Sequence, residues 1–310
     1  MKKNKNRFSV VIVHKNGVDK LIKIIDCLIE IIQSNDEIIV VDNNSSDNSI
    51  EYLKSKSKYR NIRFILNKSN FGYGKAANQG MNIATGKYFL ILNNDLYLEK
   101  NSLDLFEKNF NEYKSAGMLT GQIYNFHNNP KRTALKNPNF LSELGIFKQP
   151  SLKIIGDKVI KIENMTGACI AVRRETAETA GMYDEDFFFY FEETEWCYRL
   201  KDYSWDIYLD PKIKVFHEGG GSSKRIIFSS RVEFLRSRLI FWKKIFSPGK
   251  YYCLVIFNYF NILLRTFLYF LLTILTLGLC KRLKYKFKEK VFLLAFLSFG
   301  MPKDWGIPKF

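Results

Sequence analysis

The sequence predicts an α/β fold in which a mostly parallel sheet carries helices on both faces. Over roughly the first hundred residues, short β-rich apolar runs alternate with amphipathic segments, and short polar links join them. Such alternation is typical of parallel sheets that are covered on both sides. The chain has 310 residues, of which 46% are hydrophobic and 15% aromatic, which is enough for one large or two modest domains with a core.

Four strands and three helices account for this first part. The segment 18–32 places Leu21, Ile25 and Leu28 on one helical face and charged residues on the other. The next helix begins with the capping residues of "SSDNS". The expected strands are 8–13, 37–41, 62–66 and 87–92, and the expected helices are 18–32, 45–56 and 74–84.

The middle of the chain is less regular. The aromatic run "FFFYF" (187–191) has the composition of a core segment. The remaining expectations are a helix at 102–114, a loop through 124–139, a strand at 165–172, a helix at 192–200 and a strand at 212–216.

The composition changes near Phe228, so we expect one domain at 1–228 and a helical region at 229–310. A basic amphipathic helix (231–246) precedes a nearly apolar stretch (251–280) with Arg265 in its middle. Both flanks of that stretch are basic, and an arginine near the bilayer centre is costly. We therefore expect helices that lie in the membrane interface. A buried helical subdomain or an oligomer interface is the alternative.

The formal net charge of +17 points to nucleic acid, an anionic membrane or a phosphorylated substrate. The densest basic segments flank the apolar tail and are not spread over the expected sheet domain, and most aromatic residues sit in apolar runs, which disfavours nucleic acid. The five cysteines are scattered without a CxxC pair, so we expect reduced thiols in a cytosolic environment. The first apolar run is short and turns polar at His14, which indicates a strand and not a signal peptide.

Polar side chains follow each expected strand, where parallel sheets bind ligands. Asp42 ends the second strand and could accept hydrogen bonds from a ribose or a base edge, or cap the next helix. The glycine-rich segment 70–80 could let backbone approach a nucleotide, or form only a tight turn. Asn93, Asn94 and Asp95 end the fourth strand and suit a divalent cation that arrives with a diphosphate, although a turn cap is the alternative.

Three acids, Glu192, Glu193 and Glu195, follow the aromatic run directly. Aromatic surroundings and like charges can raise a carboxyl pKa into the range of a general base, whereas a simple helix-dipole role is the alternative. Glu192 and Glu193 are adjacent and cannot share one helical face. His217 ends the strand at 212–216 before "EGGGSS", and imidazole is a common metal ligand, although a lone histidine is more often structural.

Taken in order, several segments resemble family 2 glycosyltransferases, and most of all their rhamnosyltransferase-like branch. These segments, all within 8–225, are "SVVIVHKN", "VVDNNSSDNS", "NFGYGKAANQG", "LILNND", "TGACIAVRRE", "GMYDEDFFFYFEETEWCYRL" and "VFHEGGGSS". The resemblance implies a GT-A (Rossmann-like) fold, a nucleotide-sugar donor, Mn²⁺ or Mg²⁺, and inversion at the anomeric carbon. It also implies that Asp42 contacts the nucleotide, Asp95 and His217 bind the metal, and Glu193 is the catalytic base.

Three motifs depart from the family pattern. Asn93 stands where the D-x-D motif has its first acid, and His14-Lys15-Asn16 replaces Thr-Tyr-Asn. Glu192-Glu193 replaces Glu-Asp, so both remain catalytic candidates. The other nucleotide-sugar candidates are His14, Asn16, Asn44, Asp47, Asn70, Gly72, Gly74, Asn78, Asn93 and Asn94, and the acceptor candidates are Gly167, Tyr190 and Glu195.

The expected partners are a nucleoside-diphosphate sugar, a saccharide acceptor carried on a lipid, and an anionic membrane surface, with no nucleic acid and with an oligomer as an open option. The expected place is the cytoplasmic face of the cell membrane, as a peripheral or re-entrant protein. The expected process is cell-surface polysaccharide synthesis. Two rivals stay open: a nucleotidyltransferase acting on sugar phosphates, and a non-catalytic module that binds membranes or nucleic acid.

Overall fold

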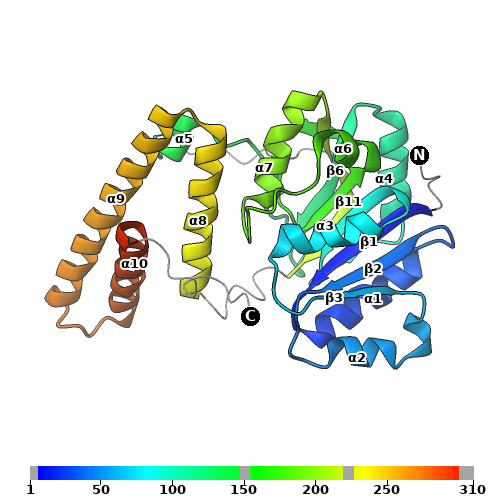
Figure 1. Ribbon diagram of the computed structural model, residues 1–310, viewed down its shortest axis with the longest axis horizontal. Helices are drawn as coiled ribbons and strands as arrows, with labels where there is room; N and C mark the ends of the chain where they lie inside the picture. Colours follow the sequence, from blue (N-terminus) through cyan, green and yellow to red (C-terminus); the bar gives the residue numbers. More distant parts are fainter. Residues whose placement is uncertain (1–5, 147–153, 155, 219–226, 300–310) are drawn as a thin grey trace. The chain divides into compact units, whose positions relative to one another are not determined.

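The computed structural model describes residues 6–146, 154, 156–218 and 227–299 (Figure 1). The chain folds into two compact units. Among the described residues, the first unit holds 6–137, 154 and 156–218, and the second holds 138–146 and 227–299. Sequence analysis had left 138–146 in the first domain.

A nine-stranded mixed sheet forms the centre of the first unit as far as it is described. Its main path runs β3-β2-β1-β4-β10-β6-β11-β5, and β8 pairs with β11. These strands are β1 (Asn6–His14), β2 (Glu37–Asp42), β3 (Arg63–Leu66), β4 (Gly86–Asn93), β5 (Leu96–Leu98), β6 (Ala116–Tyr124), β8 (Ile160–Ile162), β10 (Cys169–Arg173) and β11 (Asp206–His217). The expected parallel order holds for β3-β2-β1-β4, whereas β10 runs antiparallel to β4 and β6.

Helices cover both faces of the sheet, as predicted (Figure 1). Alternation along β1 explains how: Val10 and Ile12 enter one core cluster, and Val11 enters the other. Residues of α1 (Val18–Ile31), α2 (Ser49–Lys54) and α4 (Ser102–Glu112) complete the first cluster. Residues of α3 (Tyr73–Ile83), α6 (Arg174–Ala180) and α7 (Glu192–Arg199) complete the second. Short 3₁₀ turns follow α2 and α7 at Ser57–Tyr59 and Leu200–Tyr203.

Three expectations in this unit were wrong in detail. The helix expected at 45–56 begins at Ser49, because the preceding residues bind the loop after β1. The strand expected at 165–172 is broken into β9 (Asn164–Met165) and β10. The loop expected through 124–139 contains β7 (Ala134–Leu135), which pairs with β9 in a separate two-stranded sheet.

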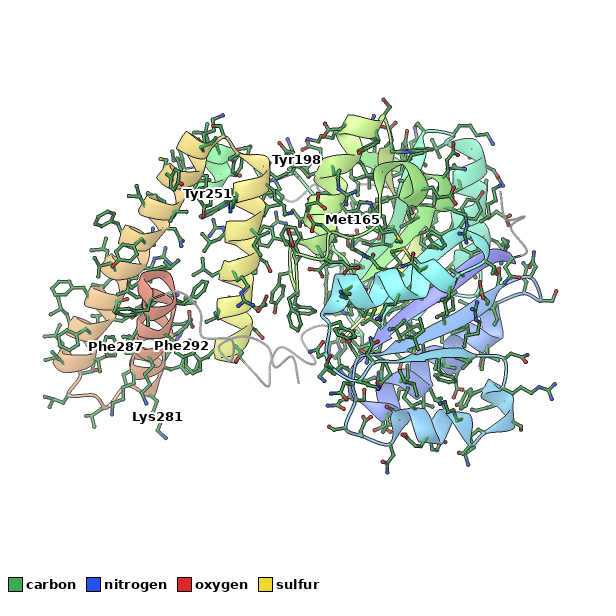
Figure 2. All side chains as sticks on the ribbon, in the orientation of Figure 1. Met165, Tyr198, Tyr251, Lys281, Phe287 and Phe292 are labelled. Carbon is green, nitrogen blue, oxygen red and sulfur yellow. The ribbon has the colours of Figure 1, made fainter. Side chains whose placement is uncertain are left out.

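The second unit consists of helices in its described part: α5 (Phe140–Glu143), α8 (Ile227–Ile245), α9 (Pro248–Leu275) and α10 (Lys281–Phe299). The basic run 281–290 and the apolar run 291–299 form the single helix α10. Aromatic side chains hold α10 in place, since Phe287 lies 5.6 Å from Phe270 of α9 and Phe292 lies 6.2 Å from Phe228 of α8, measured between ring centroids (Figure 2).

Apart from these packing contacts, α9 is little buried. It is long and apolar enough to cross a membrane by length and composition, and 11% of its most apolar stretch is buried. Figure 2 shows carbon-rich side chains of α9 that project away from α8 and α10. An exposed apolar surface of this extent indicates an interaction surface.

Candidate active site

Strand register brings the predicted residues to one edge of the sheet. His14 at the end of β1 lies opposite Asp42 at the end of β2, and Val13 lies opposite Asn93 at the end of β4. On the far side, His217 of β11 lies opposite Leu96, the residue after Asp95. Residues from four separate sequence motifs therefore meet beyond the strand ends, where ligands bind in open α/β sheets.

Asp42 presents an unused acceptor at this edge. Its Oδ2 atom accepts a hydrogen bond from the Ser45 amide at 3.1 Å, which is the turn cap that the sequence left as an alternative. Its Oδ1 atom is buried and has no partner among the described residues. A buried acceptor without a donor is costly unless a ligand supplies one. One oxygen of Asp42 thus shapes the turn, and the other is a buried acceptor whose donor no described residue supplies.

Loops after β1 and β2 hold each other in place. Asn16 and Asn44 both have positive φ, of 55° and 64°, which asparagine tolerates better than most residues. The Asn16 side chain accepts from the Ser46 amide at 2.8 Å, and Asp47 accepts from the Gly17 amide at 2.6 Å. Burial alone would raise the pKa of Asp47, but hydrogen bonds from Ser49 and Gly17 outweigh it and lower that pKa. Asn16 and Asp47 therefore hold the two loops together through these contacts. Nucleotide binding by these two residues stays a prediction.

His14 is fully buried between the two halves of the site. Its Nδ1 atom lies 2.8 Å from Nδ2 of Asn94, and its Nε2 atom lies 2.9 Å from Oγ of Ser49. The Asn94 amide donates to Nδ1, so Nε2 carries the proton and donates to Ser49. Burial lowers the pKa of His14, although Asp42 and Asp47 act in the opposite direction. A neutral His14 therefore links the Asp42 loop to the Asn93–Asp95 turn.

The glycine-rich segment packs directly on the aromatic run. A Cβ atom at Gly72, where φ is +87°, would lie 2.3 Å from the Phe188 carbonyl oxygen, and the Tyr73 amide donates to that same oxygen at 2.9 Å. Asn70 accepts from the Gly72 amide and from the buried Asn43 side chain. Close backbone approach thus explains the glycine at position 72.

Asn43 is a site residue that sequence reasoning missed. Its side chain accepts from the Phe71 amide at 3.0 Å and donates to Asn70 and to the Gly72 carbonyl. It therefore joins the Asp42 loop to the glycine-rich segment. The available signal was its place beside Asp42 at a strand end, where a polar side chain must find partners on burial.

Gly74 and Asn78 both contact Tyr183, which precedes the aromatic run 187–191. A Cβ atom at Gly74 would lie 3.1 Å from Cβ of Tyr183. Both polar atoms of the Asn78 side chain bind the Tyr183 backbone, at 2.9 and 3.1 Å. Their contacts are structural, so their roles toward a nucleotide sugar remain predictions.

Asp95 and His217 form a close, mostly buried pair. His217 Nε2 lies 2.9 Å from Asp95 Oδ1, and Lys20 Nζ lies 3.9 Å from Oδ2. The Lys20 ammonium also binds Glu218 at 2.6 Å. Burial alone would raise the pKa of Asp95, but His217 and Lys20 outweigh it and lower that pKa. Asp95 is therefore an ionised oxygen donor that faces an imidazole.

This donor set suits a cation that brings other ligands with it. Among the described residues, no group of three or more histidine, cysteine or acidic side chains is arranged to hold a metal alone. Asp95 and His217 offer one carboxylate and one imidazole, and Asn93 has no side-chain partner in the described structure. Mn²⁺ and Mg²⁺ commonly combine one or two protein ligands with phosphate oxygens. The residues present therefore fit such an ion, and sequence reasoning missed Lys20 as its competitor for Asp95.

Glu193 has the environment of a general base. Its Oε2 atom is buried without a partner among the described residues. Burial raises its pKa, although backbone amides, including that of Gly167, act in the opposite direction. A Cβ atom at Gly167 would lie 3.2 Å from Cγ of Glu193, so the glycine leaves room for this carboxylate. The break between β9 and β10 places Gly167 here.

The residues around Glu193 differ in their surroundings. Tyr190 and Phe191 have φ values of 71° and 66°, an uncommon backbone for such residues and one that concentrates at functional sites. Within "FFFYF", Phe187 is buried but the next four residues are partly exposed, so the run is a loop and not a core segment. Glu192 is 7% exposed.

Glu195 is engaged in a different way. Both of its carboxylate oxygens bind Arg199, at 2.8 and 3.0 Å, and Arg199 also binds the backbone near Met182. These are the contacts of a structural ion pair. Acceptor binding by Gly167, Tyr190 and Glu195 stays a prediction.

Tyr73 connects the metal candidates with the acids. Its hydroxyl is buried without a partner among the described residues, and sequence reasoning missed it. Burial raises its pKa well above the ordinary value, and the charges of Glu192, Glu193 and Asp95 add to this. The Tyr73 hydroxyl is thus a buried donor whose acceptor no described residue supplies, and the charges of all three carboxylates act on it.

Comparison with known proteins adds a family and a fold. The family model described as glycosyl transferase family 2 matches residues 9–181. The hexosyltransferase Agl10 of low-salt glycan biosynthesis, from Haloferax volcanii, is 24% identical over 221 residues, which are 67% of this chain and 69% of Agl10.

Two solved structures share the fold. The mannosyltransferase PcManGT from Pyrobaculum calidifontis, in complex with GDP-Man and Mn²⁺, aligns with a TM-score of 0.54 at 14% identity, over 96% of this chain and 87% of its own. GalNAc-T7 with UDP, GalNAc and Mn²⁺ aligns with a TM-score of 0.57 at 18% identity, over 69% of this chain and 44% of its own. The expected GT-A-like fold is confirmed, with a mixed and mostly parallel sheet.

Proposed function

The chain belongs to glycosyl transferase family 2, and from that premise we propose that it is an inverting, metal-dependent glycosyltransferase. Its donor is a nucleoside-diphosphate sugar and its acceptor a saccharide carried on a lipid. The observation that carries the proposal is that Asp42 and the Asp95–His217 pair lie at one sheet edge, while Glu193 packs on Gly167, whose neighbour Ala168 accepts from the Asn93 amide at 3.0 Å. The reaction needs three groups. Asp42 offers a hydrogen-bond acceptor for the nucleotide, Asp95 offers an oxygen ligand for a cation, and Glu193 offers a carboxylate with a raised pKa.

In this reaction the acceptor hydroxyl oxygen attacks the anomeric carbon while the bond from that carbon to the diphosphate oxygen breaks. Glu193 takes the hydroxyl proton, and the diphosphate leaves with the bonding electrons. A raised pKa suits this role, because general bases work best when their pKa lies nearer the operating pH. Attack opposite to the leaving group inverts the anomeric configuration.

The leaving diphosphate gains negative charge in the transition state. Positive charge placed next to the diphosphate, at Asp95, should therefore stabilise the transition state and contribute most to the rate. A divalent ion held by Asp95 and His217 would neutralise that charge when bound. Asp42 holds the nucleoside through its unused Oδ1 atom, and Tyr73 can donate its hydroxyl hydrogen to the bound substrate. Asn43 and His14 position these loops through their hydrogen bonds.

The relatives support a role in glycan synthesis. Agl10 is named as a hexosyltransferase of glycan biosynthesis, and the two solved structures hold Mn²⁺ with a nucleotide or nucleotide sugar. We therefore propose a hexose as the transferred sugar and a cell-surface polysaccharide as the product. Rhamnose stays one candidate among hexoses, because none of these three names it.

The helical unit supports membrane association. α9 exposes large apolar side chains along its length, such as Phe260, Leu264 and Phe267. Basic residues flank it on both sides in the sequence. Apolar insertion together with attraction to anionic headgroups is how interfacial helices bind. We propose that this unit holds the enzyme on the cytoplasmic face of the cell membrane, near a lipid-linked acceptor.

A donor screen tests the function. Purified protein is incubated with a panel of UDP-, GDP- and dTDP-sugars, with and without Mn²⁺, and the released products are identified. Cation-dependent release of a nucleoside diphosphate supports the proposal. In parallel incubations with nucleoside triphosphates and sugar 1-phosphates, release of inorganic pyrophosphate would point to a nucleotidyltransferase. The absence of any turnover or nucleotide binding in both sets would favour a non-catalytic module.

A further inference from the structure

A polar pocket of about 300 Å³ lies within the helical unit. Faces of α8, α9 and α10 line it, together with Glu143 at the end of α5 and the two residues that follow. Arg231 and Arg238 contribute from α8, Asn258 and Arg265 from α9, and Lys290 from α10. The arginine that interrupts the apolar sequence of α9 is therefore one wall of a pocket.

Both acidic side chains of the pocket already have basic partners. Glu143 binds Arg238 at 2.8 Å and accepts from the Trp242 indole at 2.6 Å. Glu289 binds Lys290 at 2.7 Å and Lys286 at 3.0 Å. Burial alone would raise the pKa of Glu289, but these lysines outweigh it and lower that pKa. The negative charge of the pocket is thus fully matched.

Positive charge and one donor are left over. Arg231 and Arg265 have no hydrogen-bond or ion-pair acceptor in the part of the chain that the structure describes. The Nδ2 atom of Asn258 is buried and likewise finds no acceptor there. A buried amide without an acceptor costs about 1–3 kcal/mol, which a bound ligand can recover. Arg231 and Arg265 are exposed to solvent, so their guanidinium groups can reach an anion with several oxygens, and the buried Asn258 amide gains an acceptor when that anion binds.

The pocket adjoins an apolar surface on the same helix. Asn258, Asn261 and Arg265 recur at three- to four-residue spacing, so they share one face of α9. Large apolar side chains between and beyond them are exposed, including Phe260, Leu264 and Leu268. A ligand that combines an oxyanion with hydrocarbon chains fits both features.

We propose that this pocket binds the phosphate group of a membrane lipid. Arginine suits this task, because its planar fork donates two parallel hydrogen bonds to phosphate oxygens. Arg231 and Arg265 bind the phosphate, the Asn258 amide donates to it, and the acyl or isoprenoid chain lies along α9. Free phosphate shares the oxyanion but not the chain. The inference extends the proposed membrane association and rests on it.

Vesicle binding tests the site in the full-length protein. Phosphatidylcholine vesicles carry either phosphatidic acid or oleate at matched surface charge, so that only the first set presents the phosphate monoester. We expect Arg231→Gln and Arg265→Gln each to weaken binding to phosphatidic acid vesicles about tenfold, the usual worth of a charge-assisted hydrogen bond. Arg282→Gln, an exposed arginine of α10 outside the pocket, should change it by less than about twofold.

Three results would overturn the proposal. The first is an equal loss for all three variants on phosphatidic acid vesicles, which would show diffuse charge attraction. The second is a preference of the wild-type protein for oleate. The third is inorganic phosphate displacing the protein from vesicles at the concentration at which phosphatidic acid binds it, which would show a site for free anions.

Two further measurements distinguish loss of the phosphate site from misfolding and from loss of transferase activity. Arg265→Lys keeps the charge but loses the fork, so it should bind oleate vesicles normally and lose most of the preference for phosphatidic acid. Donor turnover in detergent solution, with a soluble acceptor, should be unchanged in every variant. Failure of the proposed transferase would appear in that turnover assay, whereas failure of the lipid site would appear only in the vesicle assay.

Discussion

His217 Nε2 lies 2.9 Å from Oδ1 of Asp95, although His217 ends β11 and Asp95 lies in the turn between β4 and β5, far away in the sequence. Antiparallel pairing of β5 with β11 produces this contact, because it sets His217 opposite Leu96. The pair keeps Asp95 ionised and leaves its second oxygen 3.9 Å from Lys20. A carboxylate whose pKa is lowered in this way stays ionised and can serve as an oxygen ligand for a cation.

Asp95→Asn should abolish cation-dependent turnover, since an amide oxygen is a much weaker ligand for a hard cation than a carboxylate. The fold should persist, because this substitution changes one polar contact and removes no side chain from the hydrophobic core. Turnover with graded Mn²⁺ and a thermal unfolding curve are the measurements. Asp19→Asn, an exposed aspartate on α1, is the control. Cation-dependent turnover in Asp95→Asn near that of the control would remove Asp95 from the metal site.

Lys20→Met should strengthen Mn²⁺ binding to the nucleotide-free protein several-fold. The ammonium now neutralises Asp95 and Glu218, and a cation must compete with it for the same carboxylate. Calorimetric titration with Mn²⁺ measures the effect, with Lys23→Met on the same helix as the control. Unchanged or weaker Mn²⁺ affinity in Lys20→Met would show that the ammonium does not occupy the cation position.

Gly72→Ala should disturb the proposed nucleotide site and the aromatic run 187–191 together. The alanine would have to adopt φ near +87° and would place its Cβ atom 2.3 Å from the Phe188 carbonyl oxygen. Strain of this kind costs about 1–3 kcal/mol before the clash is counted. The thermal unfolding midpoint and the nucleotide affinity should both fall in Gly72→Ala. Gly249→Ala should change neither, because a Cβ atom at Gly249 meets open space. A normal nucleotide affinity in Gly72→Ala would mean that the two loops are independent.

Glu193 should make the protein less stable as pH rises. Its pKa is raised in the folded state, so between the unfolded value of about 4.3 and that raised value the folded protein holds a proton that the unfolded chain releases. The stability contribution is therefore complete below about pH 4 and is lost as pH rises through the folded pKa. Glu193→Gln should be more stable than wild type at neutral pH and equal to it at the acid end.

Unfolding midpoints in denaturant across this pH range measure the effect. Glu163→Gln, at an exposed glutamate of the first unit, controls for the general effect of losing a charge. A stability gain for Glu193→Gln that is the same at every pH would contradict a raised pKa at this position.

Much of the first unit could be predicted because local pattern and tertiary structure agree there. Helix 18–32 and the four strands before Asn93 were expected within two residues of where they lie. Each has the period of its own element and ends in polar residues. The site candidates at those strand ends followed from the same reasoning.

Other features depend on contacts that a single sequence does not display. The antiparallel placement of β10 and the break at Gly167 arise from pairing with β4, β6 and β7 and from the room that Glu193 needs. Lys20 and Tyr73 reach the site from helix positions that look like ordinary surface or core. Likewise, the sequence showed Arg265 only as a costly charge within an apolar helix. In the structure, side chains of three helices surround it in a polar pocket.

The central claim is that Glu193 is the base of a sugar-transfer reaction. The most direct test is the single-turnover transfer rate, at saturating donor and acceptor, of Glu193→Gln and Glu192→Gln beside wild type, with donor affinity measured by calorimetry. The account predicts a fall of about 10²–10⁴-fold for Glu193→Gln with nearly unchanged donor affinity, which is the usual worth of a general base, and a smaller fall for Glu192→Gln. A transfer rate of Glu193→Gln close to wild type, or a larger fall for Glu192→Gln, would contradict it.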